Sequence, residues 1–146
     1  FYGWPFFYWG GIQDQRVPQL RLDLQQYTKR PDYALGPHVA ALGLAFNSGT
    51  ALGARFSNGA FIGMHGSWNR YPASGYKVVY VPFNERGFPT GEKPVDVLTG
   101  FLNDKGQAQG RPVILTVGLP DMAVLGPKVA HVFIEGRQFS ASRNAI

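Results

Sequence analysis

The densest group of potentially reactive side chains lies in one short segment, residues 64–70 (MHGSWNR). This segment offers an imidazole, a hydroxyl, an indole, an amide and a guanidinium directly after an apolar run. Polar groups at the end of a strand often build a ligand site, because the sheet fixes the loop that carries them. A hydrogen-bonded loop in which Trp68 fills a gap is an equally good interpretation.

Two further candidates, His38 and Arg111, each lie just before an apolar run that reads as a strand. His38 stands in the segment GPHVAALGLAF, and its imidazole could face the same centre as residues 64–70, although an isolated histidine is more often structural. Arg111 stands in the segment QGRPV, and a lone arginine is usually a solvated surface group. Position alone therefore makes both residues candidates without giving either of them a role.

Several catalytic and metal-binding patterns are missing from the sequence. The three histidines, His38, His65 and His131, are too far apart for a zinc motif of the H-E-x-x-H type, and no acidic calcium loop occurs. The glycine-rich stretches lack both nucleotide-binding fingerprints, and Ser67 stands in G-S-W, not in a nucleophile elbow. The chain has no cysteine, which excludes disulfides and thiolate chemistry. We therefore predict no metal site in this chain, and none of these catalytic signatures supports an enzyme class.

The composition is that of a folded chain with many turns. Hydrophobic residues make up 45% and charged residues 16%, which excludes a disordered chain, and 19 glycines with 11 prolines disfavour long helices. No apolar stretch reaches the roughly 18 residues of a membrane helix, so we expect no membrane span. The net charge of +5 comes from basic residues spread along the chain without a nucleic-acid-binding motif. We therefore expect an anionic small molecule, and no nucleic acid, as the partner of these cations.

The chain opens with an aromatic run, residues 1–11 (FYGWPFFYWGG). Aromatic rings favour protein cores, so the preferred interpretation is a buried loop that packs rings between neighbouring elements. An aromatic platform on which a sugar stacks is the alternative. The start at Phe1, without Met and inside this run, suggests a piece cut from a longer protein.

The sequence predicts short strands as the elements that position the candidate residues. Residues 12–33 are polar and lack a sustained period, which predicts a long surface connection with one short helix over residues 20–27. Beyond residue 39, apolar runs alternate with turn residues, and YKVVYVPF (76–83) is apolar on both faces. The predicted strands cover residues 42–46, 60–64, 76–83, 95–102, 113–117 and 129–134. This pattern predicts an all-β fold, and periodicity alone leaves a sandwich, a barrel and a propeller open.

An ordered set of motifs resembles the glucose/sorbosone dehydrogenase family, closest to its sorbosone dehydrogenase-like branch. The motifs are YGWP (2–5), YALGPHVAALGLAF (33–46), GAFIGMHGSWNR (59–70), GYKVVYVPF (75–83), DVLTGFL (96–102) and GRPV (110–113). The resemblance implies a six-bladed β-propeller, of which residues 1–117 would form only the C-terminal blades. Residues 118–146 do not follow the family pattern, and a divergent tail or a shifted reading frame would account for them.

The same resemblance implies a quinoprotein oxidoreductase. Such an enzyme oxidises a sugar or aldehyde by hydride transfer to pyrroloquinoline quinone (PQQ), with calcium beneath the quinone and an electron acceptor afterwards. Arg111 matches the second member of a cofactor-binding Arg-x-Arg pair, whose first position is Gln109 here. His38 matches a position that touches the cofactor, and Arg70, with His65 as the second choice, falls where a cation approaches the quinone.

The resemblance also implies that this chain is incomplete as an enzyme. The catalytic base and the calcium ligands of that family lie upstream of YGWP, so we expect the chain alone to be inactive. Placement in the periplasm or outside the cell is implied by the family only. The alternative function is a non-catalytic fragment or a β module that binds a carbohydrate or a partner protein.

Overall fold

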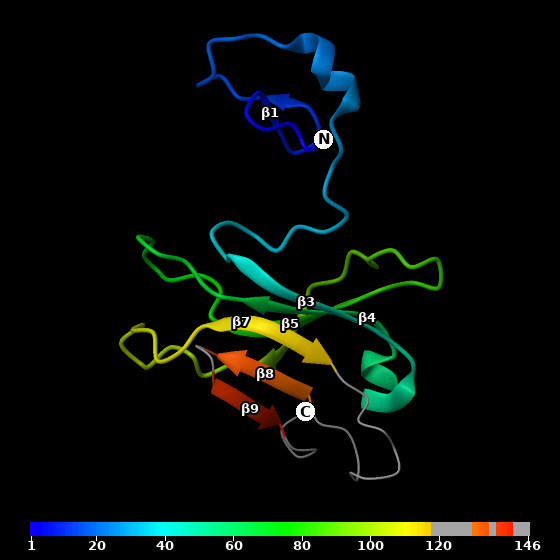
Figure 1. Ribbon diagram of the computed structural model, residues 1–146, viewed down its shortest axis with the longest axis vertical. Helices are drawn as coiled ribbons and strands as arrows, with labels where there is room; N and C mark the ends of the chain where they lie inside the picture. Colours follow the sequence, from blue (N-terminus) through cyan, green and yellow to red (C-terminus); the bar gives the residue numbers. More distant parts are fainter. Residues whose placement is uncertain (118–129, 135–136, 142–146) are drawn as a thin grey trace. The chain divides into compact units, whose positions relative to one another are not determined.

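The computed structural model describes residues 1–117, 130–134 and 137–141 (Figure 1). The chain divides into two compact units, Phe1–Ala34 (unit 1) and Leu35–Ile146 (unit 2). The division falls inside the predicted first domain of residues 1–117, at the end of the polar connection. In the parts of the chain that the structure describes, no helix is long and apolar enough to cross a membrane.

Unit 1 is a small hairpin with one short helix beside it. The strands β1 (Phe7–Tyr8) and β2 (Ile12–Gln13) pair antiparallel, and the 3-10 helix η1 spans Leu22–Tyr27. The Gln25 side chain donates a hydrogen bond of 2.9 Å to the Gly11 carbonyl, which ties the helix to the hairpin turn. The short helix predicted over residues 20–27 is thus confirmed, whereas the predicted surface connection contains a strand that polarity concealed.

The aromatic run at the start of unit 1 is mostly exposed, contrary to the preferred interpretation. Phe7 is buried at 3% exposure, but Tyr2 is 70%, Trp4 81% and Tyr8 53% exposed. Unit 1 has too few residues to enclose so many rings, because a chain of this size buries only part of its apolar surface. The packing interpretation therefore holds for Phe7 and fails for most of the run.

Unit 2 is built on a four-stranded antiparallel sheet. Its strands are β3 (Ala41–Ser48), β4 (Asn58–Met64), β5 (Lys77–Pro82) and β6 (Val95–Leu98). They are hydrogen-bonded in sequence order, β3-β4-β5-β6, and each pairs antiparallel with the next. The apolar runs predicted these four strands, and the structure differs mainly at their ends.

The core of unit 2 is a cluster of three aromatic rings and a valine. Phe56, Phe61, Val78 and Tyr80 are each at most 5% exposed. The ring centroids of Phe61 and Tyr80 are 4.9 Å apart, and those of Phe56 and Tyr80 are 5.0 Å apart with the rings edge to face. This is the arrangement that aromatic quadrupoles favour. Burial of residues 78–81 at 1% or less confirms that β5 is covered on both faces.

A second sheet accompanies the first. Its strands are β7 (Pro112–Val117), β8 (Ala130–Ile134) and β9 (Arg137–Ala141), all antiparallel. The strand β7 lies against β3 and β4 (Figure 1), and a Cβ atom at Gly63 would lie 3.5 Å from the Pro112 side chain. The runs over residues 113–117 and 129–134 predicted β7 and β8, whereas β9 was missed. The predicted tail of residues 118–146 therefore contains two strands, and its remaining residues lie outside the described part.

The predicted all-β fold class is confirmed, whereas the predicted propeller is not seen among the described residues. The chain is mostly β-strand with antiparallel sheets, as the alternating apolar runs predicted. The described strands form two open sheets and the small hairpin, and they do not close a propeller ring.

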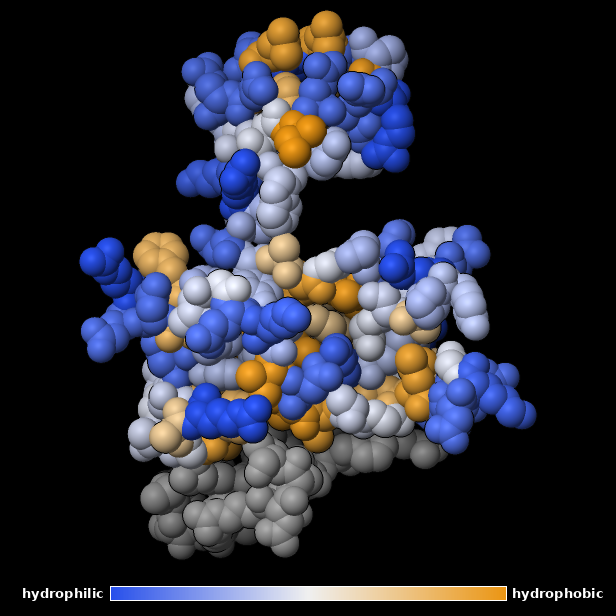
Figure 2. All heavy atoms as spheres, turned by 180° about the vertical axis from the view of Figure 1, so that it is seen from behind, coloured by the Kyte–Doolittle hydropathy of each residue, from blue (hydrophilic) through white to orange (hydrophobic). Residues whose placement is uncertain are grey.

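The edge strand β3 leaves a row of apolar side chains on the surface of unit 2. Leu42, Leu44 and Phe46 stand at alternate positions and are 58%, 57% and 66% exposed. Figure 2 shows apolar side chains reaching the surface of this unit. An exposed apolar row on an edge strand is a template for pairing with another chain. We therefore expect the isolated chain to self-associate as its concentration rises.

Changing Leu44 and Phe46 together to threonine should reduce this self-association while preserving strand structure, because threonine favours extended backbone. Sedimentation velocity across a concentration series would measure the effect. The matched control changes Leu20 and Leu22 to threonine, since these leucines are equally exposed at 61% and 58% but lie outside the sheet. Equal loss of self-association in both double variants would contradict a role for the β3 row.

Candidate functional site

The ends of β3 and β4 bring together the two segments that carry His38 and His65. The backbone N–H of His65 donates to the Ala40 carbonyl and that of Gly66 donates to the Val39 carbonyl, both at 2.9 Å. The pairing of the two strands thus continues beyond their ends. As a result, the loop over residues 65–75 begins beside the segment that precedes β3.

This loop is closed by a pair of serines. The Ser67 N–H donates to the Ser74 carbonyl at 2.7 Å, and the Ser74 N–H donates to Ser67 Oγ at 2.9 Å. The Ser74 hydroxyl in turn donates to the Pro37 carbonyl at 3.1 Å. Ser67 is buried at 4% exposure and needs these partners. The hydroxyl noted in the sequence therefore shapes the loop and is not a free nucleophile.

Two glycines let the base of the loop close tightly against Tyr76. A Cβ atom at Gly66, where φ is +103°, would lie 2.4 Å from the Tyr76 ring. A Cβ atom at Gly75, where φ is +86°, would lie 2.8 Å from the Gly66 Cα. Only glycine fits such backbone angles and contacts without strain. Tyr76 is buried, and its hydroxyl donates a short hydrogen bond to the Ser67 carbonyl.

Arg111 reaches this loop from the residue before β7. Its Nη1 atom lies 3.3 Å from His65 Nδ1 and 3.5 Å from the Gly66 carbonyl, and its Cζ atom lies 4.9 Å from the centroid of the Tyr76 ring. A guanidinium can only donate, so His65 Nδ1 must accept and the ring proton lies on Nε2. In this contact His65 therefore presents an N–H donor on its other side.

The guanidinium of Arg111 has no carboxylate partner among the residues described. The ion pairs there join Arg16 to Asp14, Arg21 to Asp23 and Lys77 to Asp96. Arg111 is half-buried, so part of its hydration is lost without compensation by a counter-ion. Such a cation, next to the Nε2–H donor of His65, suits a carboxylate or another anionic group.

The structure brings together two of the four candidate residues. His65 and Arg111 contact each other, although 45 residues separate them in the sequence. His38 is exposed and has a φ of +60°, and Arg70 is exposed in the outer part of the loop. Neither side chain makes a hydrogen bond or ion pair within the described residues, so their predicted roles stay predictions. Tyr76 was missed, because a strand pattern gave no reason to separate it from residues 77–83.

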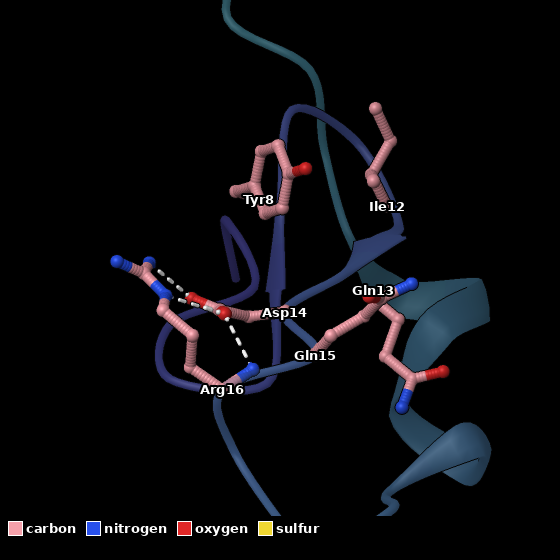
Figure 3. Close-up of a pocket in the computed structure, with 6 residues that line it drawn as sticks. All are labelled: Tyr8, Ile12, Gln13, Asp14, Gln15 and Arg16. Carbon is pink, nitrogen blue, oxygen red and sulfur yellow. Dashed lines mark hydrogen bonds and ion pairs between the residues drawn. The ribbon is translucent and has the colours of Figure 1, made fainter.

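An open cavity lies in unit 1 (Figure 3). It has a volume of about 430 Å³ and is lined by Tyr8, Ile12, Gln13, Asp14, Gln15 and Arg16. Asp14 accepts hydrogen bonds from Arg16 Nε at 2.8 Å, from Arg16 Nη2 at 2.6 Å and from the Arg16 backbone N–H at 3.0 Å. The two charges in this cavity therefore neutralise each other, in contrast to the unpaired Arg111.

The ion pair between Asp14 and Arg16 gives unit 1 a pH-dependent stability. The hydrogen bonds from the Arg16 side chain, followed by that from its backbone N–H, lower the pKa of Asp14 from 3.8 to about 2. A carboxyl group with a lowered pKa stabilises the fold above its unfolded pKa and loses that contribution as the pH falls toward its folded pKa. The contribution should therefore be present at pH 6 and disappear between about pH 4 and pH 2.

Replacing Asp14 by asparagine tests this ion pair. We expect the Asp14→Asn variant to melt at a lower temperature than wild type at pH 6, with the difference vanishing near pH 2. Fluorescence of Trp4 and Trp9, both in unit 1, would follow the melting. Asp23→Asn is the control, because Asp23 is more exposed and should contribute less. A difference that is unchanged from pH 6 to pH 2 would contradict the account.

Comparison with known proteins places this chain in a family. The TrAA12-like family model matches residues 23–115, more than half of the chain. An uncharacterized protein of Borreliella burgdorferi is 37% identical over 108 residues, which cover 70% of this chain and 28% of that protein. A PQQ-dependent pyranose dehydrogenase of Coprinopsis cinerea is 42% identical over 53 residues, which cover 36% of this chain and 6% of that enzyme.

Solved structures agree on the fold. A calcium structure of the Trichoderma reesei carbohydrate-active enzyme of family AA12 aligns with a TM-score of 0.65 at 21% identity, over 92% of this chain and 36% of that one. The holo form of the PQQ domain of pyranose dehydrogenase from C. cinerea aligns with a TM-score of 0.52 at 26% identity, over 84% and 29%. At 21% identity the first likeness shows the fold alone. The chain spans about a third or less of these proteins.

The family inferred from the motifs is thereby corrected. The matching family is TrAA12-like, so the assignment to the C-terminal part of a glucose/sorbosone dehydrogenase was wrong. Four of the six quoted motifs consist of strands β3 to β6 with the turns beside them, and the other two are short and rich in glycine and proline. Such motifs report local backbone geometry, which unrelated families on similar β folds can share. The cofactor-binding roles implied by the glucose/sorbosone dehydrogenase resemblance therefore lose their support. The case for His65 and Arg111 now depends on the contact between them in the structure.

Proposed function

This chain belongs to the TrAA12-like family, and we propose that it supplies one wall of a PQQ site in an oxidoreductase acting on sugars or aldehydes. When bound, this quinone accepts a hydride from the donor. The proposal draws on the PQQ named for the C. cinerea pyranose dehydrogenase and on the AA12 likeness. An electron acceptor for the whole enzyme and a location outside the cytoplasm are predictions of the same hypothesis.

The proposal rests on one observation: Arg111 is half-buried, has no carboxylate partner among the described residues and lies 3.3 Å from His65 Nδ1. PQQ is a tricarboxylate, and a guanidinium offers a carboxylate two parallel N–H donors. The Nε2–H of His65 would add a third. Arg70 and His38, both exposed and in the segments that meet at this strand end, would contribute longer-range charge or contacts.

Calcium fits this chain less well than the quinone does. No group of three His, Cys, Asp or Glu side chains able to hold a metal occurs among the described residues. Calcium prefers six to eight oxygen ligands, several of them carboxylates. We therefore assign no calcium ligand here and place any such ligands, with the catalytic base, outside the described residues.

We propose that the four-stranded sheet of β3 to β6 is one blade of a larger propeller ring. Four sequential antiparallel strands are the usual unit of a blade. The exposed apolar row on β3 is consistent with a neighbouring sheet that covers it in a longer protein. A blade alone leaves the site open, so we expect no turnover when this chain is mixed with PQQ, calcium, a sugar and a dye acceptor.

Titration of the chain with PQQ tests the proposed site directly. Binding should shift the absorbance of the quinone and saturate at one equivalent. The trimethyl ester of PQQ keeps the ring system but removes the three charges, so it should bind much more weakly. Equal binding of the acid and the ester would contradict a charge-based site, and no binding of either would overturn the proposal.

The exposed rings of unit 1 favour a second candidate function, carbohydrate binding. Tyr2, Trp4 and Tyr8 are each more than half exposed, and the cavity of Figure 3 adds polar side chains next to Tyr8. Sugars stack on such rings, and a titration with mono- and oligosaccharides should then quench tryptophan fluorescence. Loss of that quenching in Trp4→Ala would support this function, whereas an unchanged spectrum at high sugar concentration would overturn it.

A further inference from the structure

We infer that Tyr76 is a positioning residue that holds the Arg111 guanidinium in place for an anionic ligand. The inference rests on the proposed function in so far as PQQ is the ligand. Its structural part, the fixing of Arg111 by the Tyr76 ring, stands on this chain alone and can be tested without the cofactor.

An aromatic ring can hold a cation without neutralising it. The Arg111 Cζ atom lies 4.9 Å from the centroid of the Tyr76 ring, within the range of a cation–π interaction. A carboxylate in the same place would bind the guanidinium more tightly but would also use up its charge. The ring, the His65 Nδ1 atom and the Gly66 carbonyl together fix Arg111 and leave its charge available.

Tyr76 is itself held more firmly than a surface aromatic would be. It is 7% exposed, its hydroxyl donates to the Ser67 carbonyl, and its ring lies against Gly66. Its φ of +58° is unusual for a residue with a side chain, and strained backbone of this kind tends to persist where the surrounding structure requires it. Tyr76 therefore contacts both the backbone of the loop of residues 65–75 and the guanidinium of Arg111.

Fixing Arg111 matters because a free arginine side chain has many rotamers. Ordering such a side chain costs conformational entropy, which ligand binding would otherwise have to offset. A guanidinium that is already ordered binds its ligand with less of this cost. Removing the Tyr76 ring should thus weaken anion binding although Tyr76 need not touch the ligand.

Two substitutions separate the ring from the hydroxyl. Tyr76→Phe keeps the ring, and we expect PQQ affinity to stay within about threefold of wild type. Tyr76→Leu removes the ring, and we expect a loss of roughly 3- to 30-fold, the range of a cation–π interaction converted to affinity. In an Arg111→Ala background, Tyr76→Leu should cause no further loss, because the residue that it positions is gone.

The double-mutant cycle distinguishes positioning from general stability. Additive losses in Tyr76→Leu and Arg111→Ala, or wild-type affinity in Tyr76→Leu, would overturn the inference. Additive losses are what a purely structural role predicts: Tyr76→Leu would then lower the melting temperature and weaken PQQ binding equally with and without Arg111.

The ring contact has its own readout, which keeps the inference testable if the leucine variant fails to fold or PQQ does not bind. Protons of the Arg111 side chain should show an upfield ring-current shift in the NMR spectrum of the wild-type chain, and Tyr76→Phe should retain it. Ordinary shifts for these protons in wild type would overturn the inference. Shifted protons together with no PQQ binding would instead refute the proposed function and leave the positioning of Arg111 intact.

Discussion

Replacing Phe61 by alanine is expected to lower the free energy of unfolding by about 3–5 kcal/mol, the usual cost of truncating a buried aromatic ring. Phe61 is 3% exposed, and its ring lies 5.5 Å from that of Phe56 and 4.9 Å from that of Tyr80. Small domains have only about 5–15 kcal/mol in total. The variant should therefore be largely unfolded or melt far below wild type.

Chemical denaturation followed by circular dichroism would measure this loss. The matched control is Phe88→Ala, because Phe88 is 57% exposed and lies in the turn between β5 and β6. A surface change of this kind should stay within about 0.5 kcal/mol of wild type. Similar losses in the two variants would show that the Phe56–Phe61–Tyr80 cluster is not the core.

Replacing Arg111 by alanine is expected to weaken PQQ binding by roughly ten- to hundredfold. Charge-assisted hydrogen bonds contribute about 1.5–3 kcal/mol each, which corresponds to that range. Arg111 is expected to contribute more than any other cation of the site, because it is half-buried and already ordered by His65 and Tyr76. Higher salt should reduce the difference between the two proteins only in part, since buried charges are screened less.

Arg70→Ala is the matched control for this prediction. It removes an equal charge from the loop of residues 65–75 that Arg111 contacts, but Arg70 is exposed and makes no hydrogen bond or ion pair within the described residues. We expect a loss of less than about threefold, typical of an exposed charge, and one that salt abolishes. A larger loss for Arg70→Ala than for Arg111→Ala would mean that the loop rearranges to place Arg70 on the ligand.

The strands of unit 2 could be predicted because their apolar pattern is strong. Residues 76–83 are apolar on both faces, and β5 is indeed buried on both. The hairpin of β1 and β2 and the strand β9 were missed, because strands of two residues and polar strands carry no clear alternation. The exposure of residues 1–11 was missed for another reason. Aromatic residues are buried on average, but their number does not tell how many other residues of unit 1 are available to cover them.

Half of the candidate site could be predicted from positions at strand ends. His65 and Arg111 follow and precede strands that lie together, so their meeting follows from the sheet arrangement. The exposure of Arg70 and His38 could not be predicted, because the serine pair and the positive φ angles at His38 and Asn69 leave no trace in the apolar pattern of the sequence. Tyr76 has a weak signal in hindsight, since an aromatic residue directly after Gly75 marks a place where a ring can lie against backbone.

The location of bound PQQ on the chain tests the central claim most directly. A 15N-labelled chain titrated with PQQ would report the side-chain N–H signals of Arg111 and His65 and the indole N–H signals of Trp4, Trp9 and Trp68 in one NMR spectrum. The account predicts saturable shifts at Arg111 and His65, with unit 1 unchanged. Shifts confined to Trp4 and Trp9, with Arg111 unaffected, would contradict it and favour a ligand site in unit 1.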